Sequence, residues 1–252
     1  MKTILEITPN FPGEVFINRH VESLIQLDYP IQVLTRQTAK KNLESASIAG
    51  KLEFSFKPKI FPKFQNLSPL DMLIILKQLV QLKNFPYSKS LFRDRVYLEY
   101  IKRLNPALIH FHFGSLAAFM NWMPQELGIP YTLSLRGSDI QVIPLLSEKN
   151  AKLFQEGINN AVGIHTVSDS LWKLAEPYLN HTIYHKTIYT TVPFVENLIA
   201  RDGGDRGSEV IFVTVGRLHW IKNYVDLLKA FRRLLDTGLN AKLVIIGDGS
   251  EK

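Results

Sequence analysis

The arrangement of apolar runs along the chain limits the fold more than any other feature. Short runs rich in β-branched residues alternate with longer segments whose apolar residues recur at helical spacing. The predicted strands are residues 2–7, 31–35, 52–56, 107–113, 131–135, 162–167, 187–191, 209–215 and 241–246. The predicted helices are 68–83, 89–104, 116–127, a helical region ending at 160, 169–179, 223–235, and an early helix with Ile17, Val21, Leu24 and Ile25 on one stripe. This alternation predicts an α/β fold with a parallel sheet covered on both faces.

A polar, glycine-rich segment at 201–208 divides this pattern. We expect residues 1–195 to form a doubly wound, Rossmann-like domain and residues 196–208 to form a linker. Residues 209–252 then supply one β-α-β unit, which is too little to close a second doubly wound sheet. The unit either extends the first domain or begins an incomplete second Rossmann-like domain of a longer, truncated protein.

Composition narrows the classes of partner. The net charge of +7 favours anionic partners such as phosphorylated sugars, acidic glycans or membrane headgroups. No motif supports binding of nucleic acid. The chain has no cysteine, which excludes disulfides, thiolate metal sites and a cysteine nucleophile.

The sequence shows neither a secretory signal nor an apolar run of the roughly 20 residues that span a bilayer. We therefore expect a cytoplasmic protein whose membrane contact, if any, is peripheral. The strongly apolar helix predicted at 68–83 has lysines at 63, 77 and 83. It fits either a core helix with a basic edge or an interfacial helix on the inner face of the cell membrane.

The segment from Gly216 to Asn223 joins a predicted strand to a predicted helix. Ligands of open α/β sheets bind at the carboxyl ends of strands, and helix N-termini favour phosphate. Gly216 would let a ligand approach the backbone, while Arg217 and Lys222 would grip a diphosphate. The alternative is a glycine turn with two ordinary surface cations.

This region also carries a family resemblance. Val215-Gly216-Arg217-Leu218 with Lys222, the helix that follows, and Leu243 to Glu251 closely resemble the opening of the donor domain in family 4 retaining glycosyltransferases of the GT-B fold. The resemblance implies that Arg217 and Lys222 bind the diphosphate of a nucleotide sugar, which is a co-substrate, so no cofactor is expected. It covers the rest of the chain more loosely.

The first loop ends at Gly13-Glu14 and lacks the G-x-G-x-x-G pattern of a dinucleotide site, which argues against a nicotinamide-dependent oxidoreductase. The resemblance places Gly13 against the donor diphosphate and Glu14 nearby; the alternative is a helix-start turn. His110 and His112 fall on one side of a strand, but no third metal ligand is evident and no metal site is expected. We interpret His110 as a core residue. The resemblance places His112 beside the transferred sugar.

Two further strand ends carry polar residues. The Arg136-Gly137-Ser138-Asp139 segment either caps the next helix or, by the resemblance, recognises the acceptor through Asp139 and an acidic acceptor group through Arg136. Ser168 is interpreted as an N-cap.

The chain departs from the family after the last N-terminal strand, where the usual Asn-Gly-Val-Asp is replaced by Thr190 to Phe194. The family's nucleobase pocket and its Glu-x7-Glu motif fall beyond Lys252. The resulting hypothesis is retaining transfer of a hexose from a UDP- or GDP-sugar to a surface polysaccharide or lipid-linked glycan. The alternatives are a non-catalytic acceptor-binding module that needs a separate donor domain, and a sugar-nucleotide hydrolase or epimerase.

Overall fold

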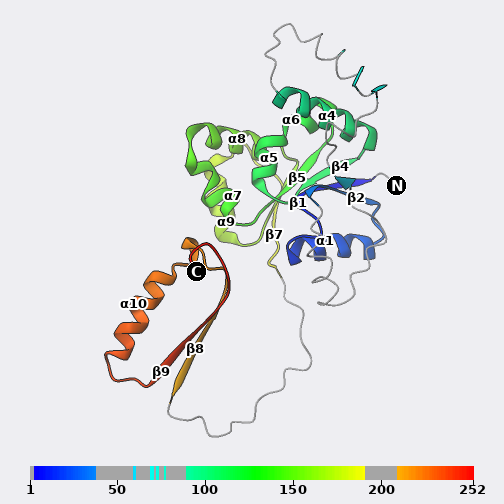
Figure 1. The fold of residues 1–252 in the computed structure, drawn as a ribbon. Helices are drawn as coiled ribbons and strands as arrows, with labels where there is room; N and C mark the ends of the chain where they lie inside the picture. The colour runs from blue at the N-terminus through cyan, green and yellow to red at the C-terminus, as the bar shows by residue number, and fades with distance from the viewer. Residues whose placement is uncertain are drawn as a thin grey trace. The chain divides into compact units, whose positions relative to one another are not determined.

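The structure of the chain is a computed structural model that describes residues 3–37, 59–60, 69–70, 72–73, 77, 89–190 and 209–252. The chain divides into two compact units, Met1–Val192 and Pro193–Lys252, and each is described by itself. Figure 1 shows a sheet wrapped by helices in the first unit and a strand-helix-strand arrangement in the second. The predicted linker at 196–208 lies outside the described residues.

The first unit is built on a seven-stranded sheet in the order β3-β2-β1-β4-β5-β6-β7. Every neighbouring pair is parallel, from the β1–β2 ladder to β6–β7. The strands are β1 (Ile4–Asn10), β2 (Ile31–Gln37), β3 (Lys59–Ile60), β4 (Leu108–Phe111), β5 (Tyr131–Leu135), β6 (Gly163–Thr166) and β7 (His185–Thr187). The predicted α/β class and parallel, Rossmann-like sheet are confirmed.

The helices of the first unit cover both faces of the sheet (Figure 1). They are α1 (Val15–Gln26), α4 (Lys89–Leu104), α5 (Gly114–Met120), α6 (Trp122–Leu127), α7 (Ser138–Gln141), α8 (Glu148–Asn159) and α9 (Asp169–Ala175), with short 3-10 turns at Ile143–Leu146 and Glu176–Tyr178. Among the described residues, no helix has the length and apolar character to span a membrane. The segment predicted as a helix at 68–83 lies mostly outside the described residues.

Side chains that alternate along the strands form two separate apolar clusters, one on each face of the sheet. Leu5 and Ile7 of β1 pack in the larger cluster, which includes Phe154 of α8 and Ile101 of α4. On the opposite face, Val33 of β2 packs with Ile17 and Val21 of α1 in a smaller cluster. Because successive strand residues point to opposite faces, Glu6 lies on the same face as Val33, its register partner.

Some strand boundaries differ from the sequence prediction. β1 continues to Asn10, through residues expected to form a loop, because Thr8 and Asn10 stay in register with β2. The last strand of the sheet is His185–Thr187, because its partner β6 ends at Thr166. The strand predicted at 52–56 lies outside the described residues.

The helix predicted over 116–127 is two helices, α5 and α6, that meet at Asn121. Pro124 cannot donate the backbone hydrogen bond that would continue the helix through Met120. The Asn121 side chain instead donates to the carbonyls of Ala117 and Ala118. A proline one turn into the second segment therefore sets the break.

Side-chain caps begin two of the later helices. The Ser168 hydroxyl accepts a hydrogen bond from the backbone N–H of Leu171, at 3.4 Å, at the start of α9. Ser147 accepts in the same way from Asn150 at the start of α8. The interpretation of Ser168 as an N-cap is confirmed.

The second unit consists of β8 (Val210–Val215), a 3-10 turn at Trp220–Lys222, α10 (Tyr224–Leu235) and β9 (Ala241–Ile246). β8 and β9 pair in parallel over six residues each. Phe212 of β8 makes an edge contact with Phe231 of α10, at a centroid distance of 5.9 Å. The side chains of Ile211, Val213 and Val215, which alternate with Phe212, are 56% to 74% exposed. The predicted β-α-β unit thus has α10 over one face, where Phe212 is still 41% exposed, and an open second face.

Gly157 of α8 packs closely against the backbone of α5. A Cβ placed there would lie 2.8 Å from the backbone nitrogen of Ala118 and 2.9 Å from its Cα. Since backbone atoms of α5 cannot move aside cheaply, we expect Gly157→Ala to lower the free energy of unfolding by about 1–3 kcal/mol, despite the better helix propensity of alanine. Urea denaturation measures this, with the exposed Lys152→Ala on the same helix as a control. Equal stability of the two variants would contradict the predicted clash.

Candidate functional site

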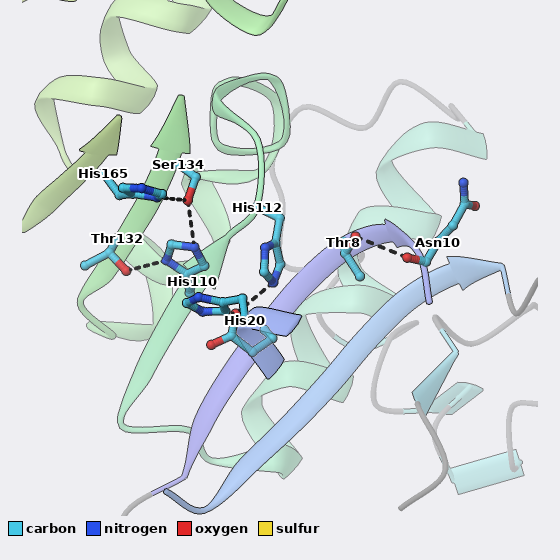
Figure 2. Close-up of polar contacts among 9 residues, drawn as sticks. Thr8, Asn10, His20, His110, His112, Thr132, Ser134 and His165 are labelled. Carbon is cyan, nitrogen blue, oxygen red and sulfur yellow. Dashed lines mark hydrogen bonds and ion pairs between the residues drawn. The ribbon is translucent and has the colours of Figure 1, made fainter. Parts of the chain in front are cut away.

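A carboxylate and two imidazoles meet on the α1 side of the sheet (Figure 2). Glu6 comes from β1, His20 from α1, and His112 from the residue directly after β4. His112 Nε2 lies 2.9 Å from Glu6 Oε2, and His20 Nε2 lies 3.6 Å from the same oxygen. Glu6 and His112 are buried, whereas the His20 side chain is 36% exposed.

His110 extends this cluster across the sheet. Its register partners are Glu6 on β1 and Thr132 on β5, so their side chains share a face. Its Nδ1 lies 2.8 Å from the Thr132 hydroxyl, and its Nε2 lies 3.1 Å from the Ser134 hydroxyl. Ser134 also bonds His165, at 2.9 Å (Figure 2). A connected row of polar groups therefore crosses the middle of the sheet, and the prediction that His110 is a core residue agrees with its burial.

Burial and mutual contact shift the pKa values of this cluster. Burial alone would raise the pKa of Glu6, but the neighbouring histidines, His110 foremost, bring it well below its usual range. Desolvation lowers the pKa of His110 to about 3 and also lowers that of His112, although Glu6 opposes both shifts. At neutral pH Glu6 is thus a carboxylate, and the imidazoles of His110 and His112 are neutral.

His112 is fully enclosed in this arrangement. Its ring faces Glu6, and it stands edge-on to both His20 and His110, at centroid distances of 5.2 Å and 5.1 Å. The contact with a transferred sugar that the resemblance implies stays a prediction. It requires the ring to become accessible.

Gly13 and Glu14 lie at a pocket beyond the carboxyl end of β1. The pocket, of about 220 Å³, is lined by Thr8, Pro9, Asn10, Gly13, Glu14, Ile17 and Phe113. The Gly13 N–H donates to Asn18 Oδ1 at 2.9 Å, and Asn18 Nδ2 donates back to the Gly13 carbonyl. The Gly13 amide is therefore already engaged, and diphosphate binding by Gly13 remains a prediction. Glu14 is exposed at the start of α1.

Arg136 lies half-buried after β5, with its guanidinium carbon 4.1 Å from the centre of the Phe16 ring. Phe16 in turn makes an edge contact with Phe113 of the pocket. Burial lowers the pKa of Arg136 to about 10, against the opposing attraction of Asp139, so the side chain stays cationic at neutral pH. Arg136 Nε is buried without a hydrogen-bond partner in the described part of the chain. Recognition of an acidic acceptor group by Arg136 stays a prediction.

Asp139 holds the loop after β5 through hydrogen bonds to backbone amides. Its carboxylate accepts backbone hydrogen bonds from Gly114 at 3.0 Å, Gly137 at 2.8 Å and Arg136 at 3.1 Å. Burial raises the pKa of Asp139, and these amides oppose the rise. The carboxylate thus ties the loop after β5 to the start of α5. The next helix, α7, has no side-chain cap, so capping of that helix by Ser138 or Asp139 is not observed, and acceptor contact by Asp139 stays a prediction.

In the second unit, the loops after β8 and β9 lie against each other. Gly216 N–H donates to the Ile246 carbonyl, and Leu218 N–H donates to the Asp248 carbonyl at 2.9 Å. A Cβ on Gly247 would fall 1.8 Å from the Gly216 carbonyl oxygen. Only glycine fits at 247, because any side chain would separate the two loops.

Arg217 and Lys222 lie on the loop braced in this way and are both exposed. Neither forms an ion pair within the ranges that the structure describes. The turn between them is closed by the Lys222 N–H, which donates to the His219 carbonyl, and Asn223 follows in a left-handed conformation before α10. Gly216, Arg217 and Lys222 therefore lie together between the carboxyl end of β8 and the amino end of α10.

The second unit falls in a stretch that resembles a known protein family in sequence. Residues 196–252 match the family described as "Glycosyl transferases group 1". The matching stretch contains both cations and the braced loops.

One curated relative, assigned to teichuronic acid biosynthesis in Bacillus subtilis (strain 168) as the glycosyltransferase TuaC, is 30% identical over 165 residues, which cover 59% of this chain and 39% of the relative. The lipopolysaccharide outer core galactosyltransferase WaaB superposes with a TM-score of 0.56 at 16% identity, over 99% of this chain and 62% of that one. Anabaena Alr3699/HepE, in complex with UDP and glucose, gives 0.59 at 14% identity, over 99% and 62%. The chain thus spans less than two thirds of each of these proteins, and the structural likeness shows a shared fold.

Sequence reasoning missed three residues that shape the first unit: Glu6, Asn18 and His20. Glu6 did carry a signal, because it is the one charge inside an otherwise apolar strand of residues 3–7. Asn18 falls between two apolar positions of the helix stripe, where a polar residue needs a partner. His20 offered no signal, because its importance depends on which strand lies beneath α1.

We expect Asp139→Ala to destabilise the first unit by about 1–3 kcal/mol, because it leaves buried amide donors without an acceptor. The measurement is urea denaturation, with the neighbouring Ser138→Ala, an exposed position, as the matched control. A loss in the control as large as that in Asp139→Ala would refute the structural role of the carboxylate.

Proposed function

We propose that this chain acts in a glycosyltransferase that takes a sugar from a nucleotide sugar, and that the second unit grips the donor diphosphate. The placement of Arg217 and Lys222 carries the proposal. Two exposed cations without ion-pair partners in the described residues flank one loop at a strand end, ahead of a helix N-terminus. Phosphate binds well at such a position, since both the cations and the helix dipole attract negative charge.

The chemistry that follows is stabilisation of a leaving group. As the bond between sugar and diphosphate breaks, negative charge grows on the diphosphate oxygens. Arg217 can supply paired N–H donors and Lys222 a compact charge, and both lower the energy of that state. A Cβ at Gly216 would lie 2.9 Å from the Tyr224 hydroxyl, so glycine at this position makes room for the Tyr224 side chain beside the loop.

The donor nucleotide, the acceptor, the transferred sugar and contact with the membrane are further proposals. A UDP-linked donor is supported by the fold likeness to a protein solved with UDP and glucose, and a GDP-linked donor remains the alternative. A cell-envelope glycan or lipid-linked acceptor is supported by the partial similarity to a relative assigned to teichuronic acid biosynthesis. Hexose transfer with retention, and contact of the enzyme with the inner membrane face, rest on the sequence resemblance.

Calorimetric titration with UDP, GDP and UDP-glucose tests the grip on the diphosphate. We expect Arg217→Ala to weaken binding by roughly tenfold or more, since a hydrogen bond to a charged group contributes about 1.5–3 kcal/mol. Arg233→Ala is the matched control, because it removes another exposed arginine of the same unit. Unchanged affinity in Arg217→Ala would refute the assignment. Failure of the folded wild-type chain to bind any nucleotide would favour an acceptor-binding module.

Product analysis distinguishes transfer from the remaining alternatives, which share the same grip on phosphate. With a nucleotide sugar and a glycan acceptor, a transferase forms a new glycoside only when the acceptor is present. A hydrolase releases free sugar, and an epimerase returns an altered nucleotide sugar, in both cases without an acceptor. We expect acceptor-dependent product, and chromatography with and without acceptor decides among the three.

A further inference from the structure

Three side chains from three separate elements converge on one point of the first unit. Glu6 of β1, His20 of α1 and His112 after β4 each offer one potential ligand atom, and these atoms all lie within 4.8 Å of one another. Their backbones belong to the central strand β1, to helix α1 and to the end of the neighbouring strand β4. Rigid elements therefore hold the three groups together.

The spacing suits a small metal ion with tetrahedral geometry. Zinc binds imidazole nitrogen and carboxylate oxygen at about 2.0–2.1 Å, which places neighbouring ligand atoms roughly 3.3 Å apart. The observed separations from Glu6 Oε2 are 2.9 Å to His112 Nε2 and 3.6 Å to His20 Nε2. These two distances bracket the expected spacing.

Hydrogen bonding does not account for the buried atoms. Glu6 Oε2 and both ring nitrogens of His112 are buried, yet none has a hydrogen-bond partner of acceptable geometry in the described residues. The 2.9 Å contact between Glu6 and His112 is therefore close without being aligned as a hydrogen bond. Buried polar atoms normally have partners, and a cation placed between them would satisfy the carboxylate oxygen and one imidazole nitrogen.

His110 supports the cluster from outside. Both of its ring nitrogens already face hydroxyls, those of Thr132 and Ser134. It stacks on His20, with ring centroids 5.3 Å apart and planes inclined by 26°. His110 therefore orients the His20 ring and does not compete as a ligand.

We propose that Glu6, His20 and His112 form a three-ligand site for Zn²⁺. Two imidazoles and one carboxylate favour zinc over Mg²⁺ and Ca²⁺, which prefer shells of oxygen ligands. The partial exposure of His20 gives the ion a way in and lets water complete the coordination. The site lies apart from the loop of Arg217 and Lys222 along the chain, but it includes His112, so a bound ion would hold the ring that the sequence resemblance places beside the transferred sugar.

The test uses the full chain without a purification tag, stripped of metal by chelation. Calorimetry with ZnCl₂ should give one site per chain, and CoCl₂ should give the absorption bands of tetrahedral cobalt. His20→Ala is the decisive variant, because His20 is partly exposed and its loss leaves both sheet residues in place. We expect it to weaken zinc binding by more than about 100-fold, since loss of a supporting partner alone costs 10–100-fold.

Two controls make the outcome unambiguous. His181→Ala removes an exposed histidine outside the cluster and should leave the single site intact. MgCl₂ should produce no binding heat. Circular dichroism confirms that each variant is folded. Absence of a one-to-one zinc site in the wild-type chain, or equal zinc affinity in His20→Ala, would overturn the proposal and leave Glu6 and His112 as a buried structural pair.

Discussion

The parallel register of β1 and β4 brings together the polar side chains that the sheet carries on its α1 face. It places Glu6 beside His110, while β5 and β6 continue the row with Thr132, Ser134 and His165. A shift of one residue in β1 would turn Glu6 into the larger apolar cluster and expose Leu5 and Ile7 to α1. The apolar residues therefore fix the register, and the register in turn brings a carboxylate and four histidines to one face of the sheet.

The sequence sufficed for the fold because the two periodicities are strong. The boundaries of α4, β5 and β9 agree with the expected ranges to the residue. The sequence was less informative at positions where the local preference of a segment competes with contacts to distant parts of the chain. The composition of residues 8–10 is typical of a turn, yet these residues pair with β2 and extend β1. The apolar spacing of residues 116–127 is that of one helix, yet Pro124 divides the segment into two.

The two candidate sites differ in the same way in how far the sequence alone could predict them. Gly216, Arg217 and Lys222 are close in sequence, so a local motif could point to them, and the structure places them on one loop. Glu6, His20 and His112 are distant in sequence and meet only through the topology of the sheet. A pattern search finds the first kind of site. The second kind needs the register of neighbouring strands, which no single segment encodes.

The close approach of Gly247 to Gly216 has a mechanical consequence. The carbonyl of one loop fills the space that a side chain of the other would take, and three backbone hydrogen bonds connect the loops. The strand ends are therefore stiff before any ligand arrives. A stiff site loses little conformational entropy when it binds a ligand. In the proposed diphosphate site, the two glycines would therefore help to determine how tightly Arg217 and Lys222 bind phosphate.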